Sequence, residues 1–481
     1  MGALDLPSAD VSINAQANAG GAGSGYIAII TPVATLDDGV PRLYASGAAA
    51  LAVHGYSPGI AYGALHAVRT RRPFLVVPIA IAVDGESSAV IATAAPTGTC
   101  VVTITDGAAG TLEDADWTLT VKTAGTIATA GIVLTLSDGY ISKTIRLGTA
   151  NSYLVPDLGF TIAFSAGTLV ADEYLTWTTT AGAIDTTGVT LARTGLAATQ
   201  YKVRTWLADT RLTVTNAGLV NAAATAYASS NERFVMARGA TTDLSESTWA
   251  LEAAALAASY AAVNSTDGRL SLGFGFRRVV CPMTGWGFRR SVAWFASLVE
   301  YRRDRDIHNT TWHRARGALE GCILGSDDTE HDERNDSGAL AGRFTCFTTL
   351  ANGTGTYIAK DLTRAADDST LLLPNNAQVT NEVCRIVSAE TTRIIGGDVI
   401  KNSDGTIDAN QAVDIEEAVN GALYRGILRE HVKGRGPRAS ACRWTASRDD
   451  DLRGGAAVMT GVAKLNLRGV ISSVLTEVVV S

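Results

Sequence analysis

The chain has 481 residues, of which 46% are hydrophobic and 18% are charged, and its formal net charge is −7. This length favours two to four domains with sizeable cores, and the negative charge argues against a protein that binds nucleic acid by neutralising phosphates. The first ten residues lack the basic and apolar regions of a secretory signal, and no apolar run reaches membrane-spanning length.

The chain begins with a Gly/Ala-rich arm and then changes to an α/β pattern. A short apolar strand at Gly25–Val33 precedes a helix with Ser57 as its N-cap and Pro58 as its first residue. The helix must end before Pro73, and the run Phe74–Val83 predicts a buried strand. The expected apolar face of the helix consists of Ile60, Leu65 and Val68. This order predicts that an α/β sheet starts here.

Between about residues 91 and 190 the sequence changes to short strands separated by turn residues. The stretch Gly131–Leu147 predicts a β-hairpin whose turn is Ser137-Asp138-Gly139, and Asp116–Thr123 alternates in the manner of a strand. Because no helical stretch intervenes, we expect a separate all-β domain inserted into a loop of the α/β part.

The α/β pattern returns after residue 196. The predicted elements are a strand at Glu232–Arg238, a helix at Ser247–Ala262, a strand at Arg269–Phe276 and a helix at Arg289–Arg303. A long amphipathic helix is predicted at Asp408–Val432. The chain then ends in Ala456–Ser481, which is rich in Val, Ile, Leu and Thr and is typical of strand up to its last residue.

Both ends of the chain have the character of extensions that join subunits. A strand at a chain end needs a partner, because chain ends otherwise fray and edge strands pair. We therefore expect residues 1–25 and 456–481 to form strands between subunits. The residues expected to give hinge freedom are Gly20, Gly21, Gly23 and Gly25, and the residues expected to pair are Val470, Val474, Val478 and Val479.

Six cysteines lie far apart, and none forms a CxxC pair: Cys100, Cys281, Cys322, Cys346, Cys384 and Cys442. This spacing indicates buried thiols in a reducing compartment and not a disulfide framework.

A metal site is weakly supported. The acidic stretch offers oxygen and imidazole ligands from Asp327, Asp328, Glu330, His331, Asp332 and Glu333. However, Asp332 stands where an EF-hand loop requires Gly, so a solvated acidic loop is the favoured interpretation. His308 and His313 are five residues apart and would not share one face of a helix.

Other catalytic motifs are also weak, so we expect no enzyme activity and no cofactor. Ser24 in GAGSGY lies in the arm and not at a strand-to-helix turn. Gly273 and Gly275 lack the third glycine of a dinucleotide motif, and close packing of a strand explains them better.

Arginine pairs near aromatic residues favour contacts between proteins. The pairs are Arg277-Arg278, Arg289-Arg290 and Arg302-Arg303. An RNA-binding face is the alternative, but nearby acids and the negative net charge favour salt bridges to a neighbouring subunit. The candidates for contact with a tube or a neighbour lie on or after the long helix: Glu416, Glu417, Arg425, Arg429, Lys433 and Arg435.

The order of these features resembles that of the tail sheath proteins of contractile bacteriophages and related contractile injection systems. The arm leads into GYIAIITPV, the SPGIAYGALHAV helix precedes FLVVPIAIAV, a β-rich insertion follows, and GTIDANQAVDIEEAVNGAL takes the place of the family's late helix. The resemblance covers nearly the whole chain and rests on layout. It implies a mixed α/β fold: a discontinuous sheath core with an inserted all-β domain and extended N- and C-terminal arms.

The corresponding division of the chain is an N-terminal arm (1–25), a first core part (26–90), the inserted β domain (91–190), a second core part (191–455) and a C-terminal arm (456–481). The resemblance implies that identical subunits form hexameric rings stacked helically around a tail tube protein, with the arms adding strands to neighbouring sheets. It also implies contacts with a baseplate and a tail terminator, no nucleic acid, no membrane insertion, and a place in the virion after assembly in the host cytoplasm. Contraction would drive the tube through the target envelope.

Two other functions stay open. One is another assembly protein, such as a tube, capsid or surface-layer component, although the two helices at Ser247–Ala262 and Asp408–Val432 disfavour a tube. The other is a metal-dependent hydrolase that uses the acidic stretch Asp327–Asp336.

Overall fold

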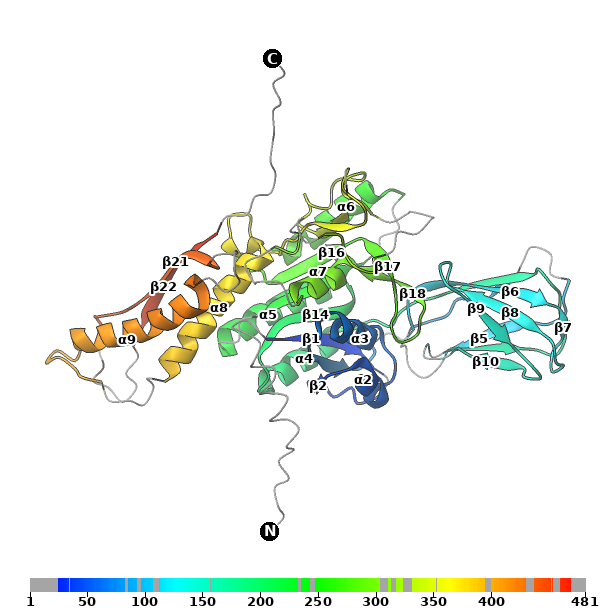
Figure 1. The fold of residues 1–481 in the computed structure, drawn as a ribbon, viewed down its shortest axis with the longest axis horizontal. Helices are drawn as coiled ribbons and strands as arrows, with labels where there is room; N and C mark the ends of the chain where they lie inside the picture. Colours follow the sequence, from blue (N-terminus) through cyan, green and yellow to red (C-terminus); the bar gives the residue numbers. More distant parts are fainter. Residues whose placement is uncertain are drawn as a thin grey trace, which may run out of the picture.

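The structure of the protein is a computed structural model. It describes residues 25–468 with gaps at 34, 83–84, 93–96, 107–111, 156–157, 159, 232–234, 243–246, 303–309, 313–316, 323–330, 352, 394–398, 430–436, 451 and 453–458. Three parts follow one another along the long axis (Figure 1). We call them the inserted domain (residues 91–179), the core (25–90 and 180–373) and the C-terminal unit (374–468). The fold is mixed α/β, as the sequence predicts.

The core is built on an eight-stranded sheet. Its strands are β1 (Tyr26–Pro32), β2 (Arg42–Tyr44), β3 (Phe74–Ile79), β14 (Val203–Leu212), β15 (Met236–Thr241), β16 (Leu270–Phe274), β19 (Thr345–Thr348) and β20 (Tyr357–Lys360). They lie in the order β2-β3-β1-β14-β15-β16-β19-β20. The six inner strands are parallel, and β2 and β20 run antiparallel at the two edges. Inner strands buried on both faces explain the nearly continuous apolar runs in the sequence.

Helices cover both faces of this sheet. They are α2 (Gly47–His54), α3 (Pro58–Thr70), α4 (Thr186–Ala198), α5 (Val214–Asn231), α6 (Trp249–Ser259) and α7 (Val292–Glu300). The side chains of β1 alternate between two hydrophobic clusters. Ala28 and Ile30 pack with α4, α5 and α6, whereas Ile27 and Ile29 pack with α2, α3 and α7.

Helix α3 begins as its sequence predicts. The Ser57 hydroxyl accepts the N–H of Ile60 at 3.3 Å, and Pro58 is the first helical residue. The predicted apolar face is corrected at Val68, which is 67% exposed, whereas Ile60 and Leu65 are buried. Val68 lies in the last turn of the helix.

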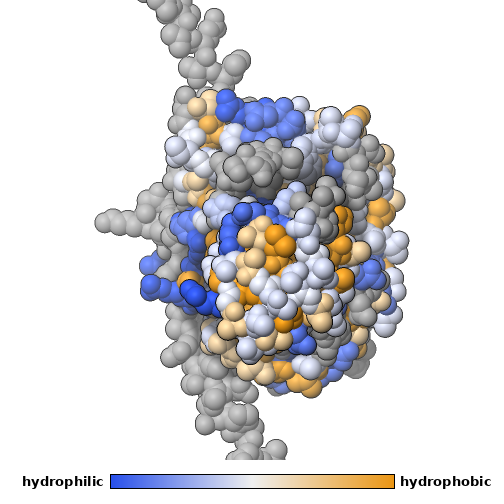
Figure 2. Space-filling view, turned by 90° about the vertical axis from the view of Figure 1, so that its right-hand side faces the viewer, coloured by the Kyte–Doolittle hydropathy of each residue, from blue (hydrophilic) through white to orange (hydrophobic). Residues whose placement is uncertain are grey.

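The inserted domain is all-β and antiparallel. One sheet has the order β4-β13-β6-β8-β9, a second has the order β10-β11-β5, and β7 pairs with β12. The strands are β4 (Ile91–Ala92), β5 (Val102–Asp106), β6 (Ala115–Thr123), β7 (Gly125–Thr126), β8 (Val133–Ser137), β9 (Ser142–Arg146), β10 (Ser152–Leu154), β11 (Phe160–Phe164), β12 (Thr168–Leu169) and β13 (Tyr174–Thr179). The predicted hairpin is confirmed as β8–β9. Figure 2 looks onto the end of this domain, where apolar and polar side chains are interspersed.

A hairpin of the core packs against the inserted domain. It consists of β17 (Phe276–Val280) and β18 (Gly287–Ser291), and it reaches toward the domain in Figure 1. Trp286 and Phe288 join the hydrophobic cluster that contains Trp117 and Trp177. The last three residues of β18, Arg289–Ser291, fall in the range predicted as the start of a helix, so that prediction is corrected: α7 begins only at Val292.

The C-terminal unit has a hydrophobic cluster of its own. It comprises α8 (Pro374–Thr392), α9 (Ala409–Leu423), a π-helical turn (Tyr424–Leu428), β21 (Ala439–Ala446) and β22 (Gly461–Leu467). The sequence division placed residues 191–455 in one core part, and the structure adds that residues 383–465 contain a separate hydrophobic cluster, whereas Ala377 packs with Met236 of the core. Two bonds dock it to the core: Arg204 donates to the Gln378 carbonyl oxygen at 2.5 Å, and Arg269 donates to that of Asn381 at 2.8 Å.

The remaining predicted elements are present with shifted ends. The predicted helix at 247–262 is α6 followed by a 3₁₀ turn at Tyr260–Val263, and the predicted strand at 232–238 is β15. Gly273 would place a Cβ 2.6 Å from the Ser291 hydroxyl, and Gly275 has a φ of +90°, so close packing and a bend explain this pair as predicted. Within the described part of the chain, no helix is both long enough and apolar enough to cross a membrane.

Candidate assembly surfaces

The hairpin β21–β22 lies at the surface of the C-terminal unit. β21 turns Cys442, Trp444 and Ala446 toward α9 and the π-helical turn. Among the described residues β22 pairs with β21 alone, and its side chains are mostly exposed. The outer side of such a strand presents a row of N–H and C=O groups that another strand can pair with.

Helix α9 closes the opposite edge of this two-stranded sheet. The Asn420 amide donates to the Trp444 carbonyl at 2.9 Å and accepts the Trp444 N–H at 2.8 Å. The Glu416 carboxylate accepts the N–H of Ala446 at 3.0 Å. These bonds occupy the outward groups of Trp444 and the outward N–H of Ala446, so α9 obstructs this edge and a further strand pairs more readily beside β22.

The register shows which residues of β22 face outward. The Ser447 N–H donates to the Thr460 carbonyl at 2.8 Å, which makes this a hydrogen-bonded pair immediately before the ladder. Pairs in an antiparallel ladder alternate between hydrogen-bonded and non-hydrogen-bonded. Lys464 therefore bonds to β21, whereas Ala463 and Leu465 direct their N–H and C=O groups to the open edge.

The predicted C-terminal arm is corrected in part. Residues Gly461–Leu467 were expected to pair between subunits, but they form β22 and pair with β21 of the same chain. Its partner strand, β21, packs on the hydrophobic cluster of the C-terminal unit, and the sequence did not reveal this pairing. The predicted arm residues that lie outside the described part of the chain are Gly20, Gly21, Gly23, Val470, Val474, Val478 and Val479.

Gly25 is explained by close packing and not by hinge freedom. A Cβ at this position would lie 2.8 Å from the Cβ of Arg204. The next residue, Tyr26, donates its N–H to the carbonyl of Lys202 at 2.7 Å. The chain is therefore already held against the residues that lead into β14 at this point.

The outer face of α9 and the following turn is exposed, as predicted for a contact surface. Glu417, Arg425 and Arg429 are exposed, together with the apolar side chains of Val413 and Tyr424. The acidic residue precedes the two basic ones along the helix, so this face carries both signs of charge. The predicted contacts Lys433 and Arg435 lie outside the described residues.

Glu416 is not a surface contact, which corrects its predicted role. Its side chain is buried against β21 and, besides the Ala446 bond, forms a salt bridge with Arg448 at 3.0 Å. Glu416 and Glu417 are adjacent in the sequence, but their side chains leave the helix about 100° apart. One therefore faces the hairpin and the other faces solvent.

The described arginines of these pairs make contacts within the chain, and the salt bridges to a neighbouring subunit stay a prediction. Arg290 forms a buried salt bridge with Glu113 of the inserted domain. Arg277 is buried above the Phe347 ring, and Arg278 donates to the Asp138 carbonyl at 3.1 Å. Arg303 lies outside the described residues.

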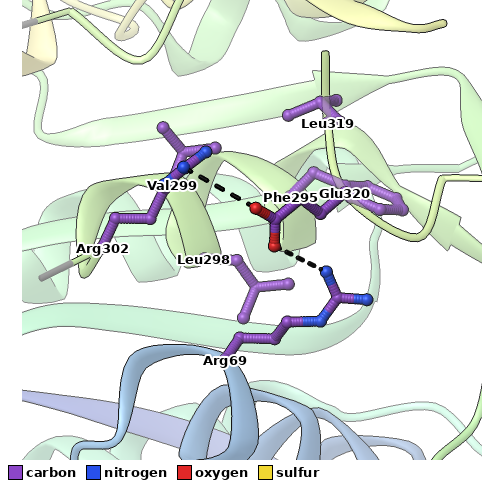
Figure 3. A pocket seen from close by; sticks show the side chains of 7 residues that line it. All are labelled: Arg69, Phe295, Leu298, Val299, Arg302, Leu319 and Glu320. Carbon is purple, nitrogen blue, oxygen red and sulfur yellow. Dashed lines mark hydrogen bonds and ion pairs between the residues drawn. The ribbon is translucent and has the colours of Figure 1, made fainter. Parts of the chain in front are cut away.

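Arg302 belongs to a small surface pocket between α3 and α7 (Figure 3). The Glu320 carboxylate lies between two guanidinium groups, 2.9 Å from Arg69 and 3.7 Å from Arg302. The pocket has a volume of about 230 Å³, and its floor is formed by Phe295, Leu298, Val299 and Leu319. Both arginines thus share one carboxylate of the same chain, which leaves a net charge of about +1 in this group.

A second crevice, of about 310 Å³, lies between the core and the inserted domain. It contains Asp209, which lies in the irregular stretch of β14 between Leu207 and Arg211 and accepts a hydrogen bond from the Thr31 hydroxyl at 3.2 Å. Burial raises the pKa of Asp209 to about 7. The Arg290–Glu113 pair forms another part of the crevice lining.

The prediction of a solvated loop is corrected for the end of the acidic stretch. His331 and Asp332 are buried, and Asp332 accepts the N–H of Thr349 at 2.9 Å. Residues 323–330 lie outside the described part of the chain, as do His308, His313 and Ser24. His331 and Glu333 lie beside Cys346 of β19. All six cysteines are free thiols, as predicted, but only Cys281, Cys346 and Cys442 are buried, and the other three are partly exposed.

Two solved structures are similar to this chain along nearly its full length. The sheath tail protein of Desulfitobacterium hafniense has 12% sequence identity over 92% of this chain and 96% of its own, with a TM-score of 0.45. The sheath tail protein of Listeria innocua has 13% identity over 94% of this chain and 98% of its own, with a TM-score of 0.43. No protein-family model and no curated protein matches the sequence. Both similar structures are sheath tail proteins, which is the family that the order of features in the sequence resembles.

Proposed function

We propose that the chain is the structural subunit of a contractile tail sheath. Copies form hexameric rings that stack helically around a tail tube protein, between a baseplate and a tail terminator. On contraction the rings rearrange and drive the tube through the target envelope. The assembly is part of the virion and is put together in the host cytoplasm.

The observation that carries this proposal is the half-open sheet of the C-terminal unit. One edge is closed by Asn420 and Glu416, and the other presents the outward backbone groups of β22. A strand from another copy adds to this edge through main-chain hydrogen bonds, each worth about 0.5–1.5 kcal/mol net. A few such bonds per subunit, repeated around a ring, hold the copies together.

The source of the added strand is another copy's terminal segment. Residues 470–481 read VISSVLTEVVVS, and β-branched residues of this kind favour a strand. The Gly/Ala-rich arm at residues 14–25 is the second candidate donor. Main-chain pairing of this kind stays in place while the body of the subunit moves.

Contacts within the chain support movement of each subunit as one body. The inserted domain is tied to the core by the Arg290–Glu113 salt bridge and by the packing of Trp286. The C-terminal unit is tied to it by Gln378 and Asn381. In a contracting sheath, the change then occurs between subunits and not within them.

The exposed face of α9 is the proposed contact with the tube or with a neighbouring subunit. It carries Glu417, Arg425 and Arg429 around the apolar side chains of Val413 and Tyr424. A small apolar centre with charges around it is typical of an interface that must form and break.

Deletion of Leu4–Gly25 tests the role of the N-terminal arm in assembly. The truncated chain should stay folded, because Tyr26–Pro32 pairs with β3 and β14 independently of the arm, but it should fail to polymerise. Circular dichroism and sedimentation should report a folded monomer, while the full chain forms tubes in negative-stain images. Normal tubes from the truncated chain would refute the role of the arm.

A further inference from the structure

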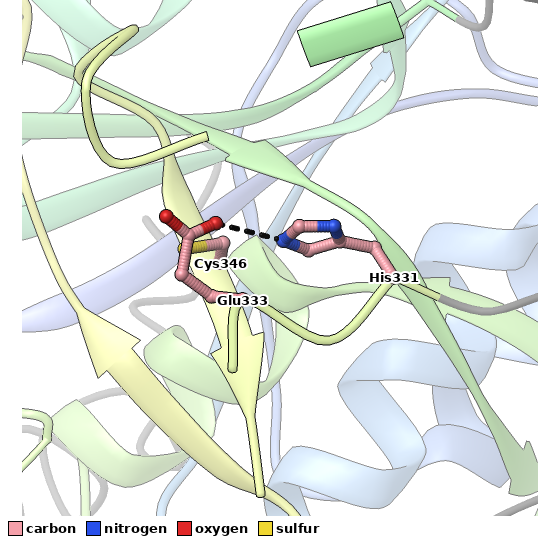
Figure 4. Close-up of side chains that lie close together, drawn as sticks. All are labelled: His331, Glu333 and Cys346. Carbon is pink, nitrogen blue, oxygen red and sulfur yellow. Dashed lines mark hydrogen bonds and ion pairs between the residues drawn. The ribbon is translucent and has the colours of Figure 1, made fainter. Parts of the chain in front are cut away.

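Three potential metal ligands lie close together at β19, the strand next to the β20 edge of the eight-stranded sheet. His331 and Glu333 come from the loop before β19, and Cys346 comes from β19 itself (Figure 4). One ligand atom from each residue lies within 4.8 Å of the other two. His331 and Cys346 are fully buried, and the Glu333 side chain is 11% exposed. Within the described residues, no other group of three histidines, cysteines or carboxylates meets this distance.

The distance between the first two ligands suits coordination as well as hydrogen bonding. His331 Nε2 and Glu333 Oε2 are 3.1 Å apart. Two ligand atoms, each about 2.0–2.2 Å from one tetrahedral zinc ion, are separated by roughly this distance. A metal therefore needs only a small outward shift of the ring and the carboxylate.

The carboxylate is held in place by the protein backbone. Glu333 Oε1 accepts the N–H groups of Gly338 and Leu340, and Oε2 accepts that of Ala339, at 3.1 to 3.2 Å. A carboxylate offers about four lone-pair sites. The fourth site points toward His331, so a metal can take it without breaking any of the backbone bonds. Hydrogen bonds that orient a ligating carboxylate are a common feature of metal sites.

The histidine can present a lone pair to a metal. Its ring is positioned by edge contacts with Phe274 and Trp249. Among the residues that the structure describes, its other nitrogen, Nδ1, has no hydrogen-bond partner. No second bond therefore fixes the tautomer: the proton can lie on Nε2, donated to Glu333, or on Nδ1, which leaves Nε2 free for a metal.

We propose that His331, Glu333 and Cys346 bind one zinc-like divalent ion that fastens the loop at residues 331–344 to β19. A set of one nitrogen, one oxygen and one sulfur ligand selects zinc or cobalt over magnesium and calcium, which prefer oxygen alone. Water completes the coordination on the partly exposed side at Glu333. The role is structural, because the ion joins the loop to the sheet.

Binding of the ion changes where protons lie on Cys346 and His331. Cys346 enters as a thiol and coordinates as a thiolate, so one proton leaves to solvent. The His331 proton moves from Nε2 to Nδ1, and Glu333 coordinates as the carboxylate. Binding therefore strengthens as pH rises, and one proton is released for each ion.

Metal titration of the full-length protein tests the site. The protein is stripped of metal with a chelator, and ZnCl₂ and CoCl₂ are added separately. We expect one ion per chain, a rise in Tm of at least about 3 °C with zinc, and a sulfur-to-cobalt charge-transfer absorption with cobalt. His331→Gln and Cys346→Ser should each abolish the cobalt absorption.

The matched control is Cys442→Ser, which removes a buried thiol from the C-terminal unit and should leave the cobalt absorption unchanged. If the two site variants fail to fold, the spectrum of the wild-type protein decides. Absence of stoichiometric zinc and of the cobalt–thiolate absorption in the wild type would overturn the proposal. Undiminished binding in folded His331→Gln and Cys346→Ser proteins would do the same.

Discussion

Arg290 and Glu113 form a buried, two-point ion pair between residues that are 177 positions apart in the sequence. The guanidinium comes from the β17–β18 hairpin of the core, and the carboxylate comes from the segment that leads into β6 of the inserted domain. The Tyr56 hydroxyl also donates to Glu113. The inserted domain is therefore joined to the core by a salt bridge as well as by hydrophobic packing. A domain inserted into a loop does not need either contact to stay attached to the chain.

Removal of one partner should destabilise this junction strongly. Glu113→Gln leaves the Arg290 charge buried without its carboxylate, which typically costs about 3–5 kcal/mol. Urea unfolding followed by fluorescence should show this loss, because Trp117 and Trp286 pack close to each other at the junction. Glu320→Gln is the control: that carboxylate is mostly exposed between Arg69 and Arg302, so its loss should cost about 1 kcal/mol or less. Equal losses in the two variants would contradict this account of the junction.

Asp209 should make stability fall as pH rises from about 4 to about 7. Burial raises the pKa of Asp209 to about 7 in the folded protein, whereas an unfolded Asp loses its proton near pH 4. Between these values the unfolded state binds fewer protons than the folded state, so stability decreases with pH, by at most about 1.4 kcal/mol per unit. Asp209→Asn should remove this component. If the unfolding free energies of the wild type and of Asp209→Asn changed with pH in parallel, the raised pKa of Asp209 would be ruled out.

Gly273 should not tolerate a side chain. An added Cβ would lie 2.6 Å from the Ser291 hydroxyl and 2.8 Å from the Ala293 nitrogen, where α7 begins. Gly273→Ala should therefore cost about 1–3 kcal/mol through overpacking and loss of the Ser291 cap. Gly218→Ala in α5 is the control, because nothing lies within 4 Å of its added Cβ; it should be neutral or stabilising by up to about 1 kcal/mol. Thermal unfolding of both variants gives the comparison.

Two adjacent proline substitutions should separate folding from assembly. Ala463→Pro removes an N–H that faces the open edge of β22, a position where proline is tolerated in an edge strand. The subunit should fold but polymerise poorly. Lys464→Pro removes an N–H that bonds to β21 and should destabilise the hairpin itself, by about 1 kcal/mol or more through the lost ladder bond. Tubes from the Ala463→Pro protein in normal yield would exclude the open edge as an assembly site.

Local patterns in the sequence predicted the local structure well. The Ser57-Pro58 cap, the apolar run from Phe74 and the turn at Ser137-Asp138-Gly139 each act over a few residues, so a single stretch of sequence contains the whole signal. The hinge assigned to Gly25 was wrong because its neighbour Arg204 is distant in the sequence. The pattern of the helix beginning at Pro58 likewise did not show that its last turn leaves Val68 in solvent.

Contacts between distant residues could not be predicted in this way. The sequence pattern of an amphipathic helix does not distinguish Glu416 from Glu417. Only the position of β21 shows that Glu416 accepts a backbone hydrogen bond from that strand. The core also buries Arg238 between Asp361 and Glu300, at 2.8 and 3.0 Å. The signal in the sequence was weak: isolated charges within or at the end of largely apolar segments, namely Arg238 in β15, Glu300 at the end of α7 and Asp361 after β20. The acidic stretch offered His331 and Glu333 as possible metal ligands, but the sequence did not show that Cys346 of β19 lies beside them.

Electron microscopy of the purified full-length protein is the most direct test of the central claim. A sheath subunit with an open β22 edge should polymerise into wide, contracted cylinders with six subunits in each ring. A preparation that stays monomeric at high concentration, or that forms closed shells, flat layers or narrow tubes, would contradict the proposed sheath function.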